Sequence, residues 1–96
     1  MTITDTATAQ TADEDADALL ARATTGDREA FASFYDLTAP RIFAILLSMT
    51  QDGTRSEALL TEIYLEAWEC LERHGSPSCA AWAWLAVLAH GHATRP

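Results

Sequence analysis

The sequence contains no lysine, and its 6 basic residues face 14 acidic ones. The formal net charge is therefore −8. Isolated nucleic-acid-binding domains are usually basic, because neutralising phosphates supplies much of their affinity. The charge predicts weak binding to DNA by the free protein, and it suits a basic protein partner.

Cysteine is also scarce, since Cys70 and Cys79 are the only two and do not make a disulfide framework. Cys70 and His74 would share one helical face, and with Cys79, His90 and His92 they raise the alternative of a zinc site. Cys79 has no CxxC partner, however, and buried thiols with surface histidines account for the pattern better. We therefore expect no metal and no cofactor.

Several patterns that carry catalysis or membrane insertion are missing. The sequence has no Ser/His/Asp set, no glycine-rich phosphate loop and no paired inward carboxylates, so we do not expect an enzyme. The longest apolar run considered, residues 80–89, is too short to span a membrane, and the N-terminus lacks the apolar segment of a signal peptide. These features predict a cytoplasmic protein without membrane contact.

The material that is present favours helices. Apolar residues make up 49% of the chain, alanine is abundant, and no run alternates with period two. We predict an all-α fold, a compact bundle of four to five helices formed by residues 15–96. Residues 1–14, rich in threonine, alanine and acidic groups, are predicted to be a disordered tail.

The first half of this domain should hold a short helix that ends at Gly26 and a second helix capped by Asp27. Pro40 either starts a new helix or kinks a continuous one. The apolar segment 42–49 is predicted to be the central core helix, exposed on few sides.

The clearest element is residues 54–71. Thr54 and Glu57 have the spacing of a capping box, in which each side chain bonds the other residue's backbone N–H. Behind it, apolar residues recur at three- and four-residue steps and predict a packing stripe: Leu60, Ile63, Tyr64, Ala67, Trp68 and Leu71. Glu62, Glu66 and Glu69 form an acidic face on another side.

A last helix is predicted from Pro77 to about His90, with Ser76 as its cap. Its composition is nearly apolar all round, which indicates burial on several sides or a partner, including a second copy of the chain. Trp82 and Trp84 point in different directions on a helix. One should pack in the core, and the other is a candidate platform for a partner or a base.

The order of these features resembles region two of the extracytoplasmic-function sigma factors, the small promoter-recognition subunits of bacterial RNA polymerase. Residues 19–22, 26–31 and 34–35 resemble the family's "LLARAAAGDRAAFAALYD", and residues 38–43 resemble "TAPRVFG". Glu57 and residues 62–68 resemble "EDLTQEVFLRVW", and Ala83-Trp84-Leu85 with Ala89-His90 resemble "AWLLTIAH". The resemblance covers residues 17–92, and nothing in the chain resembles the family's second, helix-turn-helix domain.

The resemblance implies two binding surfaces. In the family, the third helix of this domain docks on the clamp helices of the polymerase largest subunit; the implied contact residues here are Glu57, Thr61, Glu62, Leu65 and Glu66. The last helix and the loop before it melt the upstream promoter element and capture a flipped base of the non-template strand. The implied DNA-binding residues are His74, Ser76, Ser78, Trp82, Trp84, His90, His92 and Arg95.

The chain also departs from the family at both surfaces. Ala58 and Thr61 stand where the family has Asp and Gln, and Gly91 and His92 stand where it has paired arginines. Lost arginines remove phosphate contacts. An alternative hypothesis is therefore a degenerate sigma-like module that no longer reads DNA and binds an anti-sigma factor or another copy of itself.

Overall fold

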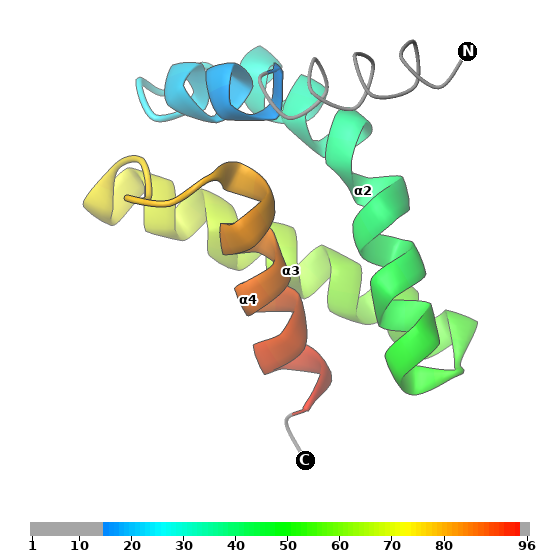
Figure 1. The fold of residues 1–96 in the computed structure, drawn as a ribbon. Coiled ribbons are helices and arrows are strands. Elements are labelled where there is room, and N and C mark those ends of the chain that lie inside the picture. The colour runs from blue at the N-terminus through cyan, green and yellow to red at the C-terminus, as the bar shows by residue number, and fades with distance from the viewer. Residues whose placement is uncertain (1–14, 95–96) are drawn as a thin grey trace, which may run out of the picture.

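The structure is a computed structural model, and it describes residues 15–94. The predicted N-terminal tail and Arg95 lie outside the described residues. Residues 15–23 form a first helix, and α2 (Arg28–Thr50), α3 (Gly53–His74) and α4 (Ala81–Ala93) follow (Figure 1). Residues 15–94 contain no strand, so the prediction of an all-α fold is confirmed.

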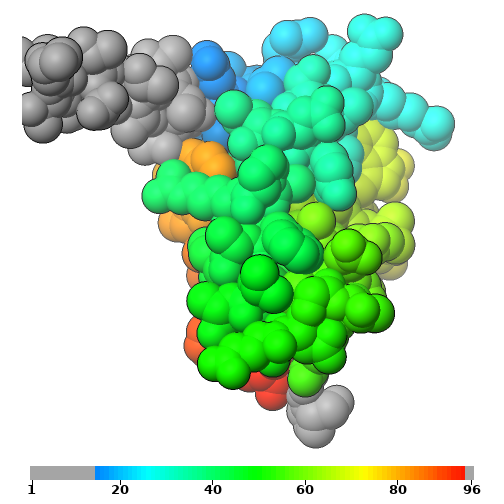
Figure 2. Space-filling view, turned by 90° about the vertical axis from the view of Figure 1, so that its right-hand side faces the viewer, coloured from blue at the N-terminus to red at the C-terminus, as the bar shows by residue number. Residues whose placement is uncertain are grey.

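The three longer helices pack against one another in every pairing. Figure 1 shows α4 crossing in front of α3, with the first helix beside the N-terminal part of α2. Seen from the side, α2 forms most of the visible surface of the described residues, with α3 and α4 at its two edges (Figure 2). The largest fully buried apolar side chains come from all three helices: Phe34, Ile42, Leu46, Ile63 and Leu85.

The start of α2 agrees with the sequence prediction. Gly26 has a φ of +93°, a left-handed conformation that costs glycine little and reverses the chain after the first helix. Asp27 then caps α2, because its Oδ1 accepts a hydrogen bond from the Ala30 N–H at 3.0 Å. This bond, aided by Arg22, lowers the pKa of the Asp27 carboxyl below its usual value.

Pro40 lies inside α2, so the helix continues through it and does not restart there. The prediction for segment 42–49 is wrong in part: Ile42 and Leu46 are fully buried, but Leu47 and Met49 are each 40% exposed. The reason is the helical period, which turns only one stripe of an apolar segment toward the core.

By length and composition, the helix Arg28–Thr50 would be able to cross a membrane, contrary to our expectation that no segment would. Length and composition alone are weak evidence for a membrane span, because core helices can have the same properties. In the most apolar 18-residue stretch of this helix, 33% is buried inside the molecule.

The cap of α3 differs from the predicted box. The helix begins at Gly53, and Asp52 caps it by accepting a hydrogen bond from the Arg55 N–H at 3.1 Å. Thr54 and Glu57 therefore lie inside the helix, and the capping-box prediction is wrong. Asp52 is itself a good cap residue and stands two residues earlier, so it captures the free N–H groups first.

The start of α4 also differs. The helix begins at Ala81, so residues 77–80 are not helical, and Ser76 bonds the Thr24 hydroxyl at 2.7 Å and caps nothing. The cap comes from the first helix instead: Asp17 Oδ1 accepts a hydrogen bond from the Ala81 N–H at 2.7 Å. The carboxylate also faces the positive end of the helix dipole.

We predict that Asp17→Ala lowers the free energy of unfolding by about 0.5–2 kcal/mol, the usual cost of losing a helix cap. Asp17→Asn keeps an oxygen acceptor, and its loss should be smaller. Urea denaturation followed by circular dichroism measures both variants. Asp15→Ala, an exposed carboxylate on the same helix, is the matched control and should have little effect. An equal loss in all three variants would contradict the assignment of Asp17 as the cap.

Candidate functional site

One side of α3 packs in the core, and the other carries the predicted contact residues. Five of the six predicted stripe residues are buried, and Trp68 is half-buried, so the predicted packing stripe is confirmed. Glu57, Thr61, Glu62 and Leu65 are exposed, and Glu66 is half-buried. Their spacing spreads the five over the half of the helix that faces away from the packing stripe, with Glu57 at one edge of this half and Glu66 at the other. We call these five residues the α3 contact face.

Leu65 is the unusual member of this face. Its side chain is 59% exposed, although its neighbours on the contact face are polar. Leu65 and Thr61 also border a pocket of about 380 Å³, whose other walls are aromatic: Phe31, Tyr35, Tyr64 and Trp68. The contact face therefore joins an acidic edge to an apolar, aromatic hollow, which suits a partner with both basic and apolar side chains.

The aromatic cluster beneath this hollow escaped the sequence analysis. Tyr35 meets Tyr64 edge-on with ring centroids 4.7 Å apart, and Phe31 meets Trp68 in the same way at 4.9 Å. Each pair joins α2 to α3, at separations where such pairs add stability beyond the area that they bury. The 3.6-residue spacing of apolar residues indicates which side chains of one helix face the core. It does not indicate which other helix those side chains contact.

Tyr64 also connects the contact face to the interior. The Thr38 hydroxyl donates to the Phe34 carbonyl oxygen at 2.7 Å, so the Tyr64 hydroxyl is the donor in its 2.5 Å bond with Thr38. Burial raises the pKa of Tyr64 to about 12, because the phenolate would lose its hydration.

This shift predicts a loss of stability in alkali. The folded state holds the Tyr64 proton more tightly than the unfolded state, whose pKa is near 10. The protonated Tyr64 hydroxyl therefore makes its full contribution to the free energy of unfolding below pH 10. This contribution, about 2–3 kcal/mol in total, is lost as the pH rises toward 12. Urea denaturation between pH 9 and 12 measures the loss. Tyr64→Phe should be less stable at pH 8 but show a flatter profile, and an equally steep profile would contradict the prediction.

His92 is the predicted DNA-binding residue whose position is least expected. Its side chain is only 8% exposed, and it lies against the α3 contact face. The Nε2 atom is 2.9 Å from Glu66 Oε1, and Nδ1 is 3.8 Å from Glu62 Oε2. The structure thus brings one predicted DNA-binding residue together with two predicted polymerase-binding residues.

The remaining predicted DNA-binding residues are spread over one end of α3, the following loop and α4. His74, Ser76, Ser78 and His90 are exposed. Trp82 and Trp84 are both half-buried and pack against the core, so the expected division into one core and one exposed tryptophan is not found. Among the described residues, Trp82 Nε1 is buried without a hydrogen-bond partner.

Arg41 is a candidate residue that the sequence analysis did not single out. Its guanidinium carbon lies 4.6 Å from the centroid of the Trp82 ring, a cation–π distance that joins α2 to α4. Arg41 lies within the motif at residues 38–43, which was the available signal. Arg41 is exposed, so it adds one positive charge to the protein surface beside Trp82, one of the predicted DNA-binding residues.

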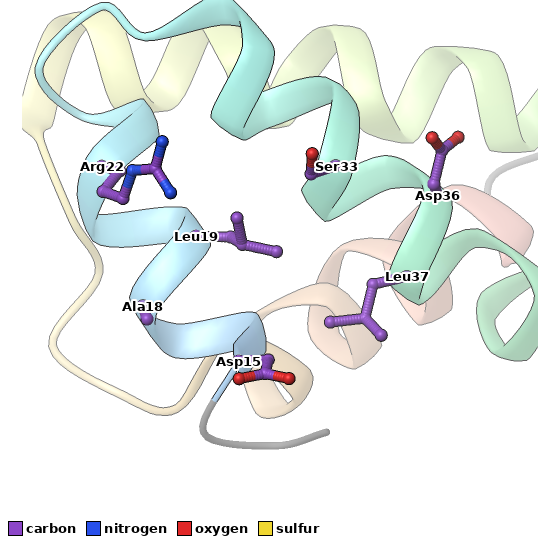
Figure 3. Close-up of a pocket in the computed structure, with 7 residues that line it drawn as sticks. All are labelled: Asp15, Ala18, Leu19, Arg22, Ser33, Asp36 and Leu37. Carbon is purple, nitrogen blue, oxygen red and sulfur yellow. The ribbon is translucent and has the colours of Figure 1, made fainter. Parts of the chain in front are cut away.

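A pocket of about 600 Å³ lies elsewhere, between the first helix and α2 (Figure 3). Leu19 and Leu37 point into it, while Asp15 and Asp36 are charged lining residues. None of the predicted site residues lines this pocket. Arg22, another lining residue, pairs with Asp27 at 3.2 Å.

The residues weighed as zinc ligands do not come together. Over residues 15–94, no three His, Cys, Asp or Glu side chains form a group that could hold a metal ion. Cys70 is half-buried and Cys79 exposed, and both are free thiols.

Sequence comparison finds curated relatives with one shared description. The chain is 40% identical over 79 residues to the ECF RNA polymerase sigma factor SigK of Mycobacterium tuberculosis (strain H37Rv). It is 36% identical over 80 residues to SigK of Mycobacterium ulcerans and 35% identical over 77 residues to SigK of Mycolicibacterium vanbaalenii. The matches cover 80–83% of this chain but 39–43% of the relatives.

The chain therefore spans less than half the length of the curated relatives that it matches. No protein-family model matches it. No solved structure matches it either.

Proposed function

We propose that this chain, a relative of the ECF RNA polymerase sigma factors, works as a region-two domain in transcription initiation. In this proposal the α3 contact face binds the clamp helices of core RNA polymerase. The loop 75–80 and α4 bind the upstream promoter element. Both partners place the protein in the cytoplasm, and no catalysis by the chain itself is involved.

The observation that carries the proposal is the combination of sequence relationship and an exposed leucine on the α3 contact face. An apolar side chain that is 59% exposed among carboxylates gains most when a partner covers it. The acidic neighbours Glu57 and Glu62 would attract a basic partner and orient it before contact.

The segment proposed to bind DNA carries no acidic residue of its own, despite the net charge of −8. From His74 to Thr94 the sequence contains no Asp or Glu, so a phosphate backbone meets no carboxylate of this segment. Arg41 beside Trp82 supplies one cation there. Few positive charges predict weak binding to DNA by the free protein and useful binding only when polymerase presents the promoter.

The test is a titration of fluorescently labelled wild-type protein with purified bacterial core RNA polymerase, in the absence of DNA. We expect saturable binding with a Kd of micromolar or lower. Promoter DNA is then added to the preformed complex, which should retain it better than core polymerase alone. No binding to core polymerase at micromolar concentration would overturn the proposal.

A second candidate function is a sigma-like module that binds a regulatory protein, such as an anti-sigma factor, or a second copy of itself. Two observations favour it: Val87 is 69% exposed on α4, which contains no Asp, Glu, Lys or Arg, and Gly91 and His92 stand where the resemblance leads us to expect arginines. This candidate predicts no binding in the polymerase titration and a dimer by light scattering at high concentration.

A further inference from the structure

His92 holds the last turn of α4 against α3. The ring is 8% exposed and sits over the half-buried carboxylate of Glu66, 2.9 Å from Nε2 to Oε1. The Glu62 carboxylate is on the other side of the ring, 3.8 Å from Nδ1. His92, which comes from a different helix, thus bonds Glu66 directly and lies close to Glu62.

This contact withdraws part of the α3 contact face from solvent. His92 occupies one of the acceptor sites of the Glu66 carboxylate, and its ring lies where a cationic side chain of a partner would approach Oε1. A partner that approaches Glu62 and Glu66 must displace the imidazole or pack around it, and a displaced hydrogen bond lowers the net gain on binding.

Gly91 lies in the same turn as His92, and a glycine within a helix favours the unfolded turn because it loses more backbone freedom on folding. A Cβ atom added at Gly91 would meet nothing within 4 Å, so packing does not require glycine at this position. The contact between His92 and Glu66 thus lies on a turn that the glycine makes less stable.

We propose that His92 is an autoinhibitory latch, which occupies the Glu66 carboxylate of the α3 contact face until a partner opens the last turn of α4. The inference rests on the proposed function, because it regulates the same face. The latch and the partner compete for the Glu66 carboxylate, so weakening the latch strengthens binding.

The test compares core polymerase binding by the wild type with binding by three variants. His92→Ala removes the latch and should lower the Kd by about 3–10-fold, the range expected for one hydrogen bond that no longer has to be broken. Gly91→Ala stabilises the turn and should raise the Kd by about 2–5-fold. Ser33→Ala, at an exposed residue of α2 that belongs to neither proposed binding surface, is the control and should leave the Kd unchanged.

Amide hydrogen exchange of residues 90–94 provides a second readout, and circular dichroism verifies that each variant is folded. Exchange should become faster in His92→Ala and slower in Gly91→Ala. Binding by His92→Ala that equals the wild type, or is weaker, would overturn the latch while leaving the proposed function in place. Absence of binding by every variant would overturn the proposed function and the latch with it.

Discussion

Replacing Phe34 with alanine is expected to lower the free energy of unfolding by about 3–5 kcal/mol. Phe34 is fully buried, and its ring meets both Phe31 and Tyr64, at centroid distances of 6.0 and 6.3 Å. The variant loses the burial of a large side chain and leaves a cavity between α2 and α3. A domain of this length has only about 5–14 kcal/mol in total, so the loss takes a large share of it.

Thermal denaturation followed by circular dichroism measures this effect, and the midpoint should fall by at least roughly 12 °C. Phe34→Leu fills most of the same space and should lose much less. Ser33→Ala changes the exposed residue next to it and should stay within about 0.5 kcal/mol of the wild type. A loss below about 1 kcal/mol in Phe34→Ala would mean that this ring is not a central part of the core.

The parts of the fold that were predictable from sequence are those fixed by near neighbours in the chain. The Asp27 cap acts three residues away, and the stripe on α3 follows from spacing within one helix. Both predictions are confirmed. Asp17 could not be identified in this way, because it caps α4 across 64 residues of sequence.

The ends of α3 and α4 show how competing local signals mislead. Thr54-x-x-Glu57 has the pattern of a capping box, but Asp52 offers a carboxylate two residues earlier and takes the role. Ser76-Pro77 has the pattern of a helix start, but the Ser76 hydroxyl bonds Thr24 and the chain stays irregular to Ala80. In both places the sequence pattern is present, but another hydrogen bond forms in its place: the Arg55 N–H bonds Asp52, and the Ser76 hydroxyl bonds Thr24.

For the candidate site, the sequence identified which residues are polar and accessible on α3 but not what lies against them. The contact between His92 and Glu66 joins residues 26 apart on different helices, and the crossing of α3 and α4 creates it. The resemblance to a family implies a DNA-binding role for position 92, whereas the structure shows a histidine there that lies against Glu66 of α3.

The crossing of α3 and α4 also brings the two proposed binding surfaces closer together than their positions in the sequence suggest. Trp82 packs with Arg41 of α2 at the start of α4, and His92 packs with Glu66 of α3 at its end. Occupation of either surface therefore acts on a helix that contributes to the other. A partner on α3 that releases His92 would also free the end of α4 that is proposed to meet DNA.

The second large effect concerns Leu65, where arginine is expected to raise the Kd for core polymerase by about 10–100-fold. The substitution removes the exposed apolar group that a partner would cover. It also places a positive charge beside Glu62 and Glu66, where it faces a partner proposed to be basic. Because Leu65 is 59% exposed, the variant should remain folded. The titration of labelled protein with core polymerase measures the Kd directly.

Val87→Arg is the matched control for this prediction. It makes the same chemical change at an apolar residue with similar exposure, 69%, but on α4 and away from the α3 contact face. If α3 forms the contact, the two variants have equal stability and equal net charge but differ at least tenfold in polymerase affinity. Equal weakening of both would show that the added charge acts through the whole protein. Loss in Val87→Arg alone would move the polymerase contact to α4 and leave the face around Leu65 for another partner.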